Sequence, residues 1–255
     1  YHFILLIPLW GNAQGILKGK VVEAVTLQSI PYATIGLSKQ NSGCNADLDG
    51  VFAISSKYSD DTIIISSVGY QTTKISVLSL ETNNIITSSA KVKTLKEVIV
   101  ADRRTSSTIN PNNCEANNYL TSNSTQYQVA QLMQAPKNNS LLQNIKVCME
   151  KNQGKTVFRV RIYDFDSVTA GPGEELSDTA IQIATNGKEN FINLEPYRIF
   201  LPQKSFFVSI EWLIIPINKN SFKAKFEGGK RTFVQYKPYI GLRPILNNNM
   251  EIWSL

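Results

Sequence analysis

Alternation of apolar and polar positions is the main signal in the first third of the chain. Short runs in which every second residue is apolar are separated by turn residues, a pattern typical of antiparallel β-structure. We expect strands at 16–23, 32–38, 51–56, 62–68 and 74–78. Strands of this length and spacing predict one small β-sandwich.

The same alternation returns after residue 140. Rows of alternating apolar residues run through 141–149, 157–163 and 206–214, with Gly and Pro between them. These rows predict a second β-sandwich of jelly-roll type. Trp212 lies on the third row, so we expect it in the core. The sequence therefore predicts an all-β fold built from two sandwiches.

Residues between the two patterns are rich in Ser, Thr and Asn and show little alternation, which favours a linker. A weak helical period marks 126–134 within it. The predicted organisation has four parts: a signal peptide at 1–13, a first sandwich at 14–102, a linker at 103–139 and a second sandwich at 140–255.

The segment 1–13 holds an apolar run followed by small residues. The run is shorter than the ~20 residues that a membrane helix needs, and it lacks the alternation of a first strand, so it predicts a secretory signal. The best later candidate for a membrane span, 206–217, is short and carries Glu211 at its middle. We therefore expect an exported protein, in the periplasm, associated with the outer membrane or at the cell surface, without a transmembrane span.

The net charge is +6, with 26 basic and 20 acidic residues. The basic residues are scattered through strands and loops, and no basic helix or recognition motif appears, so we expect no nucleic-acid partner. For an exported protein, anionic lipid head groups or acidic glycans are the expected counter-surfaces. A charge that serves solubility alone is an equally good interpretation.

Histidine and cysteine content limits the chemistry. The single histidine, His2, lies in the predicted signal, so the mature chain lacks the base of Ser-His and Cys-His catalysis and the commonest zinc ligand. We expect no catalytic residue and no cofactor. The spacing of Cys44, Cys114 and Cys148 matches no metal site. We expect three thiols, although an oxidising compartment permits one disulfide.

Two groups of residues are weak candidates for a site. Five carboxylates surround Gly171–Gly173 in a predicted long loop; a solvated turn is the favoured interpretation, with Ca²⁺ binding or glycoside hydrolysis as alternatives. They are Asp164, Asp166, Glu174, Glu175 and Asp178. Three aromatic residues, Tyr236, Tyr239 and Trp253, are candidates for stacking on a sugar, the two tyrosines in a loop-like stretch. Asp47–Gly50 resembles part of a calcium loop but lacks the bidentate Glu, so we expect a hairpin turn.

Four segments of the first third carry a family resemblance: 19–22 (GKVV), 30–35 (IPYATI), 47–52 (DLDGVF) and 63–70 (IIISSVGY). Their order resembles the carboxypeptidase-regulatory-like domain, a transthyretin-like (prealbumin-like) sandwich common in envelope proteins of the Bacteroidota. The resemblance implies a module without chemistry of its own. A segment like 95–100 follows this module in TonB-dependent receptors, and as an extended strand it can pair with another protein's sheet edge.

These observations predict a non-catalytic exported envelope protein that acts as a protein-binding or assembly module. Its partner would be an envelope protein or an outer-membrane complex. The alternative is a glycan-binding accessory protein that holds a polysaccharide on the second sandwich. A hydrolase using the acidic loop 164–178 is the third interpretation.

Overall fold

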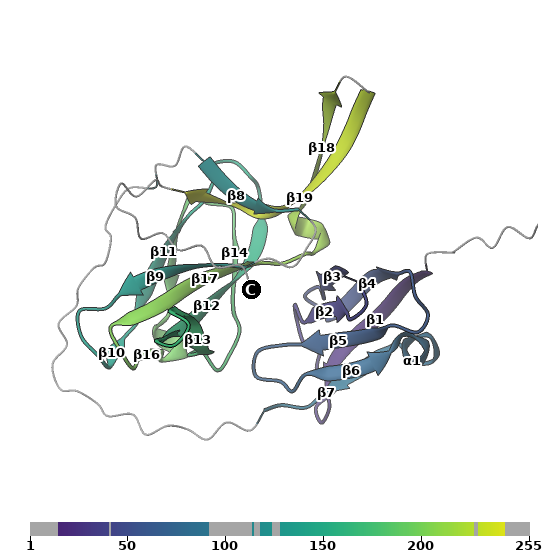
Figure 1. The fold of residues 1–255 in the computed structure, drawn as a ribbon, viewed down its shortest axis with the longest axis horizontal. Coiled ribbons are helices and arrows are strands. Elements are labelled where there is room, and N and C mark those ends of the chain that lie inside the picture. The colour runs from purple at the N-terminus through teal and green to yellow at the C-terminus, as the bar shows by residue number, and fades with distance from the viewer. Residues whose placement is uncertain are drawn as a thin grey trace, which may run out of the picture.

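The computed structural model describes residues 15–40, 42–91, 114, 118–123, 128–226 and 229–242. In these ranges strands dominate, and the one α-helix is the short α1 (Val77–Thr82). The predicted all-β fold class is confirmed. The elements form two bodies, β1 to β7 with α1 in one and β8 to β19 in the other (Figure 1). The predicted signal at 1–13, the strand at 95–100 and Trp253 lie outside the described residues.

The first body is a β-sandwich of two sheets. Alternate residues of its strands are buried, so each sheet turns one apolar face towards the other. The three-stranded sheet has the order β4 (Val51–Ser56), β1 (Gly15–Glu23), β7 (Ile85–Ser88). The four-stranded sheet has the order β3 (Ser42–Asn45), β2 (Thr34–Leu37), β5 (Thr62–Ser66), β6 (Thr73–Ser76). β1 pairs with β7 in parallel, so the first sheet is mixed rather than wholly antiparallel.

Local chemistry changes one predicted strand. We expected a strand at 74–78, but β6 ends at Ser76 and α1 begins at the next residue. The Ser76 side chain accepts a hydrogen bond from the backbone N–H of Ser79 at 3.1 Å, which is the usual cap of a helix N-terminus. Val77 and Leu80 of this helix are buried in the core of the sandwich. The helix thus extends the first core.

The turn at Asp47–Gly50 is present, but it is not a hairpin. The carboxylate of Asp47 accepts hydrogen bonds from the backbone N–H groups of Asp49 and Val51, at 3.0 and 2.9 Å. Gly50 has a φ of +74°, in the region that glycine tolerates best. The strands before and after this turn, β3 and β4, belong to different sheets. The turn therefore carries the chain across the sandwich.

The second body has a five-stranded sheet and a covering layer. The large sheet contains β9 (Gln128–Gln134), β12 (Thr156–Asp166), β13 (Gly171–Glu175), β14 (Ile181–Thr185) and β17 (Ser205–Trp212). The covering pairs are β11 (Asn144–Cys148) with β15 (Glu189–Asn193) and β10 (Ser140–Leu141) with β16 (Phe200–Leu201). The main apolar core lies between these layers and includes Phe158, Ile162 and Phe206. The more specific jelly-roll assignment stays a prediction.

The remaining elements of the second body are a third sheet and two short helices. The sheet has the order β18 (Lys219–Phe226), β19 (Gly229–Leu242), β8 (Asn118–Ser122). The 3₁₀ helices are η1 (Glu195–Tyr197) and η2 (Pro216–Asn218). Trp212 is fully buried, and its indole N–H donates to the Pro238 carbonyl at 2.6 Å, so its predicted core position is confirmed.

Part of the predicted linker belongs to these sheets. β8 and β9 lie between residues 118 and 134, and the segment with a weak helical period is the strand β9. β9 pairs with β17, and its Ala130 is buried beside Phe207 and Tyr163. Gln128 is buried as well, because its amide bonds to the Tyr163 hydroxyl at 2.9 Å. Pairing with a distant strand outweighs the weak local preference.

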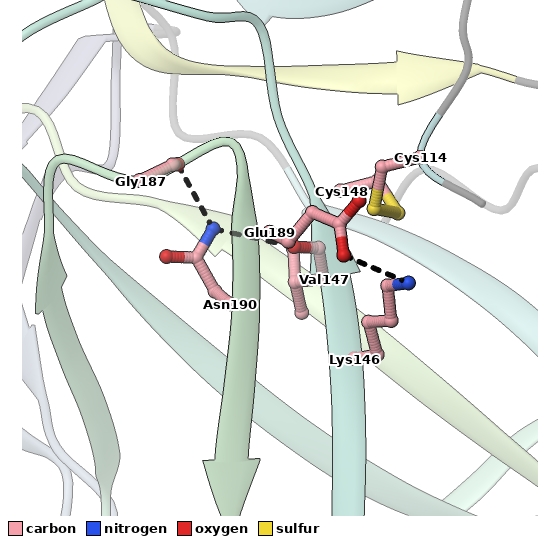
Figure 2. The surroundings of a disulfide bond; sticks show 7 residues. All are labelled: Cys114, Lys146, Val147, Cys148, Gly187, Glu189 and Asn190. Carbon is pink, nitrogen blue, oxygen red and sulfur yellow. Dashed lines mark hydrogen bonds and ion pairs between the residues drawn. A yellow bond between two sulfur atoms is a disulfide. The ribbon is translucent and has the colours of Figure 1, made fainter.

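A disulfide joins Cys114 to Cys148 at the end of β11, contrary to the expectation of three thiols (Figure 2). The two Cα atoms are 5.2 Å apart, within the usual range for such a bridge. Beside it, Lys146 of β11 forms an ion pair with Glu189 of β15 at 3.1 Å. The bridge ties the chain at residue 114 to the covering layer of the second sandwich. Cys44 is not part of it and lies buried in the first sandwich.

The two bodies contact each other directly. Ile214, which follows β17, packs into the core of the first sandwich. In return, Tyr32 of the first sandwich packs against Val157, Leu213 and Ile215 of the second. The guanidinium of Arg159 on β12 donates to the backbone carbonyl of Tyr32 at 2.6 Å. A residue of the second body therefore completes the core of the first, and a residue of the first covers a smaller apolar cluster of the second.

Candidate interaction surface

Four of the five predicted acidic residues lie in β12 and β13 rather than in a long loop, and the fifth, Asp178, lies between β13 and β14. β12 continues through Asp166 and β13 begins at Gly171, so the segment is a β-hairpin with a short turn. Asp166 accepts hydrogen bonds from Val168 and Thr169 within that turn, which lowers its pKa. These hydrogen bonds of the Asp166 carboxylate stabilise a tight turn, which is sufficient to explain them.

The other carboxylates of the hairpin have different neighbours. Asp164 accepts a hydrogen bond from the Gln203 amide at 2.7 Å. Glu175 accepts two from Arg161, at 3.0 and 2.7 Å. In the described part of the chain, no group of three or more His, Cys, Asp and Glu side chains is arranged to hold a metal ion. The structure therefore does not bring the five candidates together around one point.

A buried charged network, which the sequence did not indicate, lies on the face of the large sheet opposite its main core. Arg159 donates to both oxygens of Glu211, at 2.9 and 3.0 Å, and both side chains are almost completely buried. Arg161 bridges Glu211 and Glu175 beside them. Burial has the largest single effect on the pKa of Arg161 and acts to lower it, but the hydrogen bonds to Glu175 and the charges of Tyr163, Glu175 and Glu211 together leave the pKa raised. Both carboxylates are held by guanidinium groups, which suits a structural role.

The two described aromatic candidates lie in β19 rather than in a loop. The Tyr236 ring packs against the core of the first sandwich, and burial raises the pKa of its hydroxyl. The Tyr239 hydroxyl accepts a hydrogen bond from the Asn220 amide at 2.7 Å. Both tyrosines are only partly exposed. They lie at the base of a hairpin and contribute contacts within the protein.

That hairpin is the most unusual surface feature. We call β18 together with residues 229–236 of β19 the projecting hairpin, because it extends away from the other elements of the second body and from the first body (Figure 1). Among the described strands, β18 pairs only with β19, and β8 pairs with β19 from Tyr236 onward. The projecting hairpin is thus a two-stranded ribbon. An isolated ribbon of this kind is only marginally stable in water.

One face of the projecting hairpin is aromatic. Phe222 lies directly opposite Phe233, and their ring centroids are 5.6 Å apart in a stacked arrangement. Phe226 packs on Phe233 at 5.7 Å, and the Arg231 guanidinium lies 6.0 Å from the centre of the Phe226 ring. The three phenylalanines remain 43%, 50% and 38% exposed, in the order Phe222, Phe226, Phe233. This aromatic face is not covered by any other described element.

The opposite face of the projecting hairpin is cationic. Successive strand residues point to opposite faces, so the residues that alternate with the phenylalanines share the second face. Four of them are lysines: Lys219, Lys223, Lys225 and Lys230. Lys225 and Lys230 are directly opposite each other, an arrangement of like charges that destabilises a strand pair. No carboxylate of the described residues forms an ion pair with these four lysines.

The base of the projecting hairpin is held firmly. The buried side chain of Asn218, in η2, bonds to the backbone N–H and C=O of Val157 at 2.9 and 2.6 Å and to the Leu213 carbonyl at 2.8 Å. On β19, the Lys237 ammonium donates to the carbonyls of Gln153 and Lys155, at 3.1 and 2.7 Å. Burial lowers the pKa of this ammonium. The ribbon therefore projects from an ordered support.

Comparison with known proteins bears on the first sandwich alone. Residues 17–100 match the family model of the CarboxypepD_reg-like domain. The chain carries a CarboxypepD_reg-like domain in its N-terminal part. The predicted resemblance is confirmed for these residues, which end before the second sandwich begins. No curated protein and no solved structure matches the chain.

A signal for the projecting hairpin is present in the sequence, although none of the expected strands covers it. Phe222, Ala224 and Phe226 alternate with Lys223 and Lys225, which is the pattern of a two-faced strand. The alternation predicts two faces, but it does not show that neither face is covered.

No helix of the described residues is long and apolar enough to cross a membrane.

Proposed function

We propose that this protein is a non-catalytic, exported binding module that uses the projecting hairpin to hold a protein partner of the cell envelope. The observation that carries the proposal is the exposed aromatic face of the hairpin. Stacked phenylalanines on a ribbon outside the core bury little area against their own chain, whereas aromatic residues are enriched where proteins bind each other. Contiguous exposed apolar surface of this kind marks an interaction site.

The neighbouring features support a binding role over a catalytic one. Glu175 and Glu211 are two carboxylates that share an arginine, and both form ion pairs with arginine side chains. The CarboxypepD_reg-like domain packs against the second sandwich through Tyr32 and Ile214. We propose that it serves as a rigid support that fixes the direction of the projecting hairpin.

Export is part of the same proposal, and the disulfide supports it. Bridges between cysteines persist in oxidising compartments and are rare in the cytosol. Alkylation of intact cells, followed by gel analysis with a mass-tagged maleimide, should show Cys114 and Cys148 protected from the reagent. A fully reactive pair in the cells that normally produce the protein would contradict export.

Site-specific photo-crosslinking tests the binding role. A Phe222→benzoylphenylalanine variant of the full chain, irradiated in those cells, should give a discrete adduct with one protein. The control variant carries the same group at Val168, which is 91% exposed in the turn after β12. Equal adducts at both positions, or none at position 222, would contradict the proposal.

A further inference from the structure

We infer that the partner contributes an extended strand of alternating acidic and apolar residues, which adds to the outer edge of β18. This inference rests on the proposed binding function and specifies the kind of segment that is bound. Three observations lead to it: the edge of β18, the separation of its two faces, and the unmatched lysines.

No described strand pairs with the outer edge of β18 at any point along its length. β18 has eight residues, Lys219–Phe226, and forms a register with β19 from Lys219↔Tyr236 to Phe226↔Gly229. In an antiparallel pair, alternate residues direct their backbone N–H and C=O groups away from the neighbouring strand. An added strand can hydrogen-bond to these groups, which is a common way of recognising extended peptides.

The two faces decide which partner fits. Phenylalanines occupy one face of the projecting hairpin and lysines the other. A flat anionic surface that contacts the phenylalanine rings would therefore lie on the opposite side of the ribbon from the lysines and could not contact them. A strand added in the plane of the ribbon meets both faces at once. Its own side chains alternate, placing one set beside Phe222 and Phe226 and the other beside Lys223 and Lys225.

The positive charge of the lysine face determines which side chains suit the second set, those beside Lys223 and Lys225. Lys225 and Lys230 repel each other across the ribbon, and lysines on an exposed edge also discourage pairing with a second, equally basic copy of the same edge. Acidic side chains on the incoming strand relieve the repulsion and select against a cationic or neutral strand. The favoured segment therefore has acidic residues towards the lysine face and apolar residues towards the aromatic face.

Synthetic peptides test this mode of binding with the full-length protein. The probe is a fluorescent eight-residue peptide that alternates Glu and Val, and its control has the same composition with the residues in two blocks. Two further probes carry N-methyl groups on alternate backbone amides. In one peptide the odd-numbered amides are methylated, and in the other the even-numbered amides. Strand addition predicts at least tenfold weaker binding for the block peptide and for only one of the two methylated peptides.

Variants of the protein locate the site. The double variant Lys223→Glu, Lys225→Glu should weaken the alternating peptide at least tenfold, whereas Lys57→Glu, Lys137→Glu makes the same charge change at exposed positions elsewhere and should leave binding unchanged. Thermal unfolding midpoints of both variants confirm that the fold is retained. Equal binding of all peptides, or equal loss in both variants, overturns the inference.

Three further outcomes separate this inference from the proposed function. The partner segment crosslinked at position 222 is identified by mass spectrometry, and an adduct in a helical or basic segment overturns strand addition while the binding function stands. Absence of the adduct refutes the function itself. Co-sedimentation with phosphatidylglycerol vesicles that depends on Lys223 and Lys225 assigns the hairpin to a lipid surface and overturns the inference.

Discussion

Asn45 and Ile214 form a reciprocal pair of hydrogen bonds between the two sandwiches. The backbone N–H of Asn45 donates to the carbonyl of Ile214 at 3.2 Å, and the backbone N–H of Ile214 donates to the side-chain oxygen of Asn45 at 2.8 Å. Both residues are buried. The side-chain amide of Asn45 also donates to the Thr34 hydroxyl at 3.3 Å, so the residue ties two strands of the first sandwich to the second.

Removing this side chain should destabilise the protein. Asn45→Ala leaves the N–H of Ile214 buried without an acceptor, and we expect a loss of about 2 kcal/mol in the free energy of unfolding. Urea denaturation measures it. Asn186→Ala, at an exposed position, is the control and should change stability by less than about 0.5 kcal/mol. Similar values for both variants would show that the contact between the sandwiches contributes little.

Gly50 should tolerate no side chain. A Cβ atom there would lie 2.6 Å from the Val21 carbonyl oxygen, and φ is +74°. We expect Gly50→Ala to lower the free energy of unfolding by about 2 kcal/mol or more, since the strained backbone and the clash act together. Gly36→Ala is the matched control because a Cβ at Gly36 meets nothing within 4 Å. Equal stability of the two variants would contradict the geometry of the turn.

Breaking the buried ion pair between Arg159 and Glu211 should destabilise the protein strongly, whereas replacing both residues by apolar ones should destabilise it much less. Glu211→Gln leaves the Arg159 guanidinium buried opposite a neutral amide, and we expect destabilisation of about 3–5 kcal/mol. The double variant Arg159→Met, Glu211→Leu should recover most of that loss, because both desolvated charges are removed together. Asp60→Asn breaks the exposed pair with Lys39 and should have a much smaller effect. A double variant less stable than Glu211→Gln would argue for a specific role of the charges.

The disulfide should contribute substantially to stability. It closes a loop with a sequence separation of 34, for which the chain-entropy model gives about 3–4 kcal/mol. We expect the variant Cys114→Ser, Cys148→Ser to unfold at lower urea concentration, with a free energy of unfolding lower by that amount. A reducing agent should produce the same shift in the wild type and none in the variant. A shift in the variant would mean that the reagent acts elsewhere.

The Cys44 thiol predicts a specific alkaline loss of stability. Burial raises the pKa of this thiol to about 12 from an ordinary value of 9.0. Above pH 9 the thiol ionises in the unfolded chain but stays protonated in the folded one, so its contribution falls as pH rises from about 9 towards 12. Urea denaturation at pH 8, 9 and 10 should show a steeper decline for the wild type than for Cys44→Ala. Parallel pH profiles would refute the assignment.

Local alternation was sufficient to place several strands. The strand expected at 51–56 is β4 with the same bounds, because its residues alternate regularly between exposed and buried positions. It was insufficient for β9, where Gln128 occupies a buried position. A buried glutamine reads as polar in the sequence, and its partner Tyr163 lies 35 residues away. Nothing local indicates that this amide is satisfied inside the fold.

The sequence by itself determined that this protein is all-β, because a period of two and turn residues are local properties. The order of four short segments in its first third carried the resemblance to the carboxypeptidase-regulatory-like domain, which the match over residues 17–100 confirms. Tertiary structure alone decided that Cys114 meets Cys148, that Asn45 joins the two sandwiches, and that the three phenylalanines of the projecting hairpin stay partly exposed. A period of two shows that a strand has two faces. Which distant segment covers each face depends on long-range packing, which no local pattern encodes.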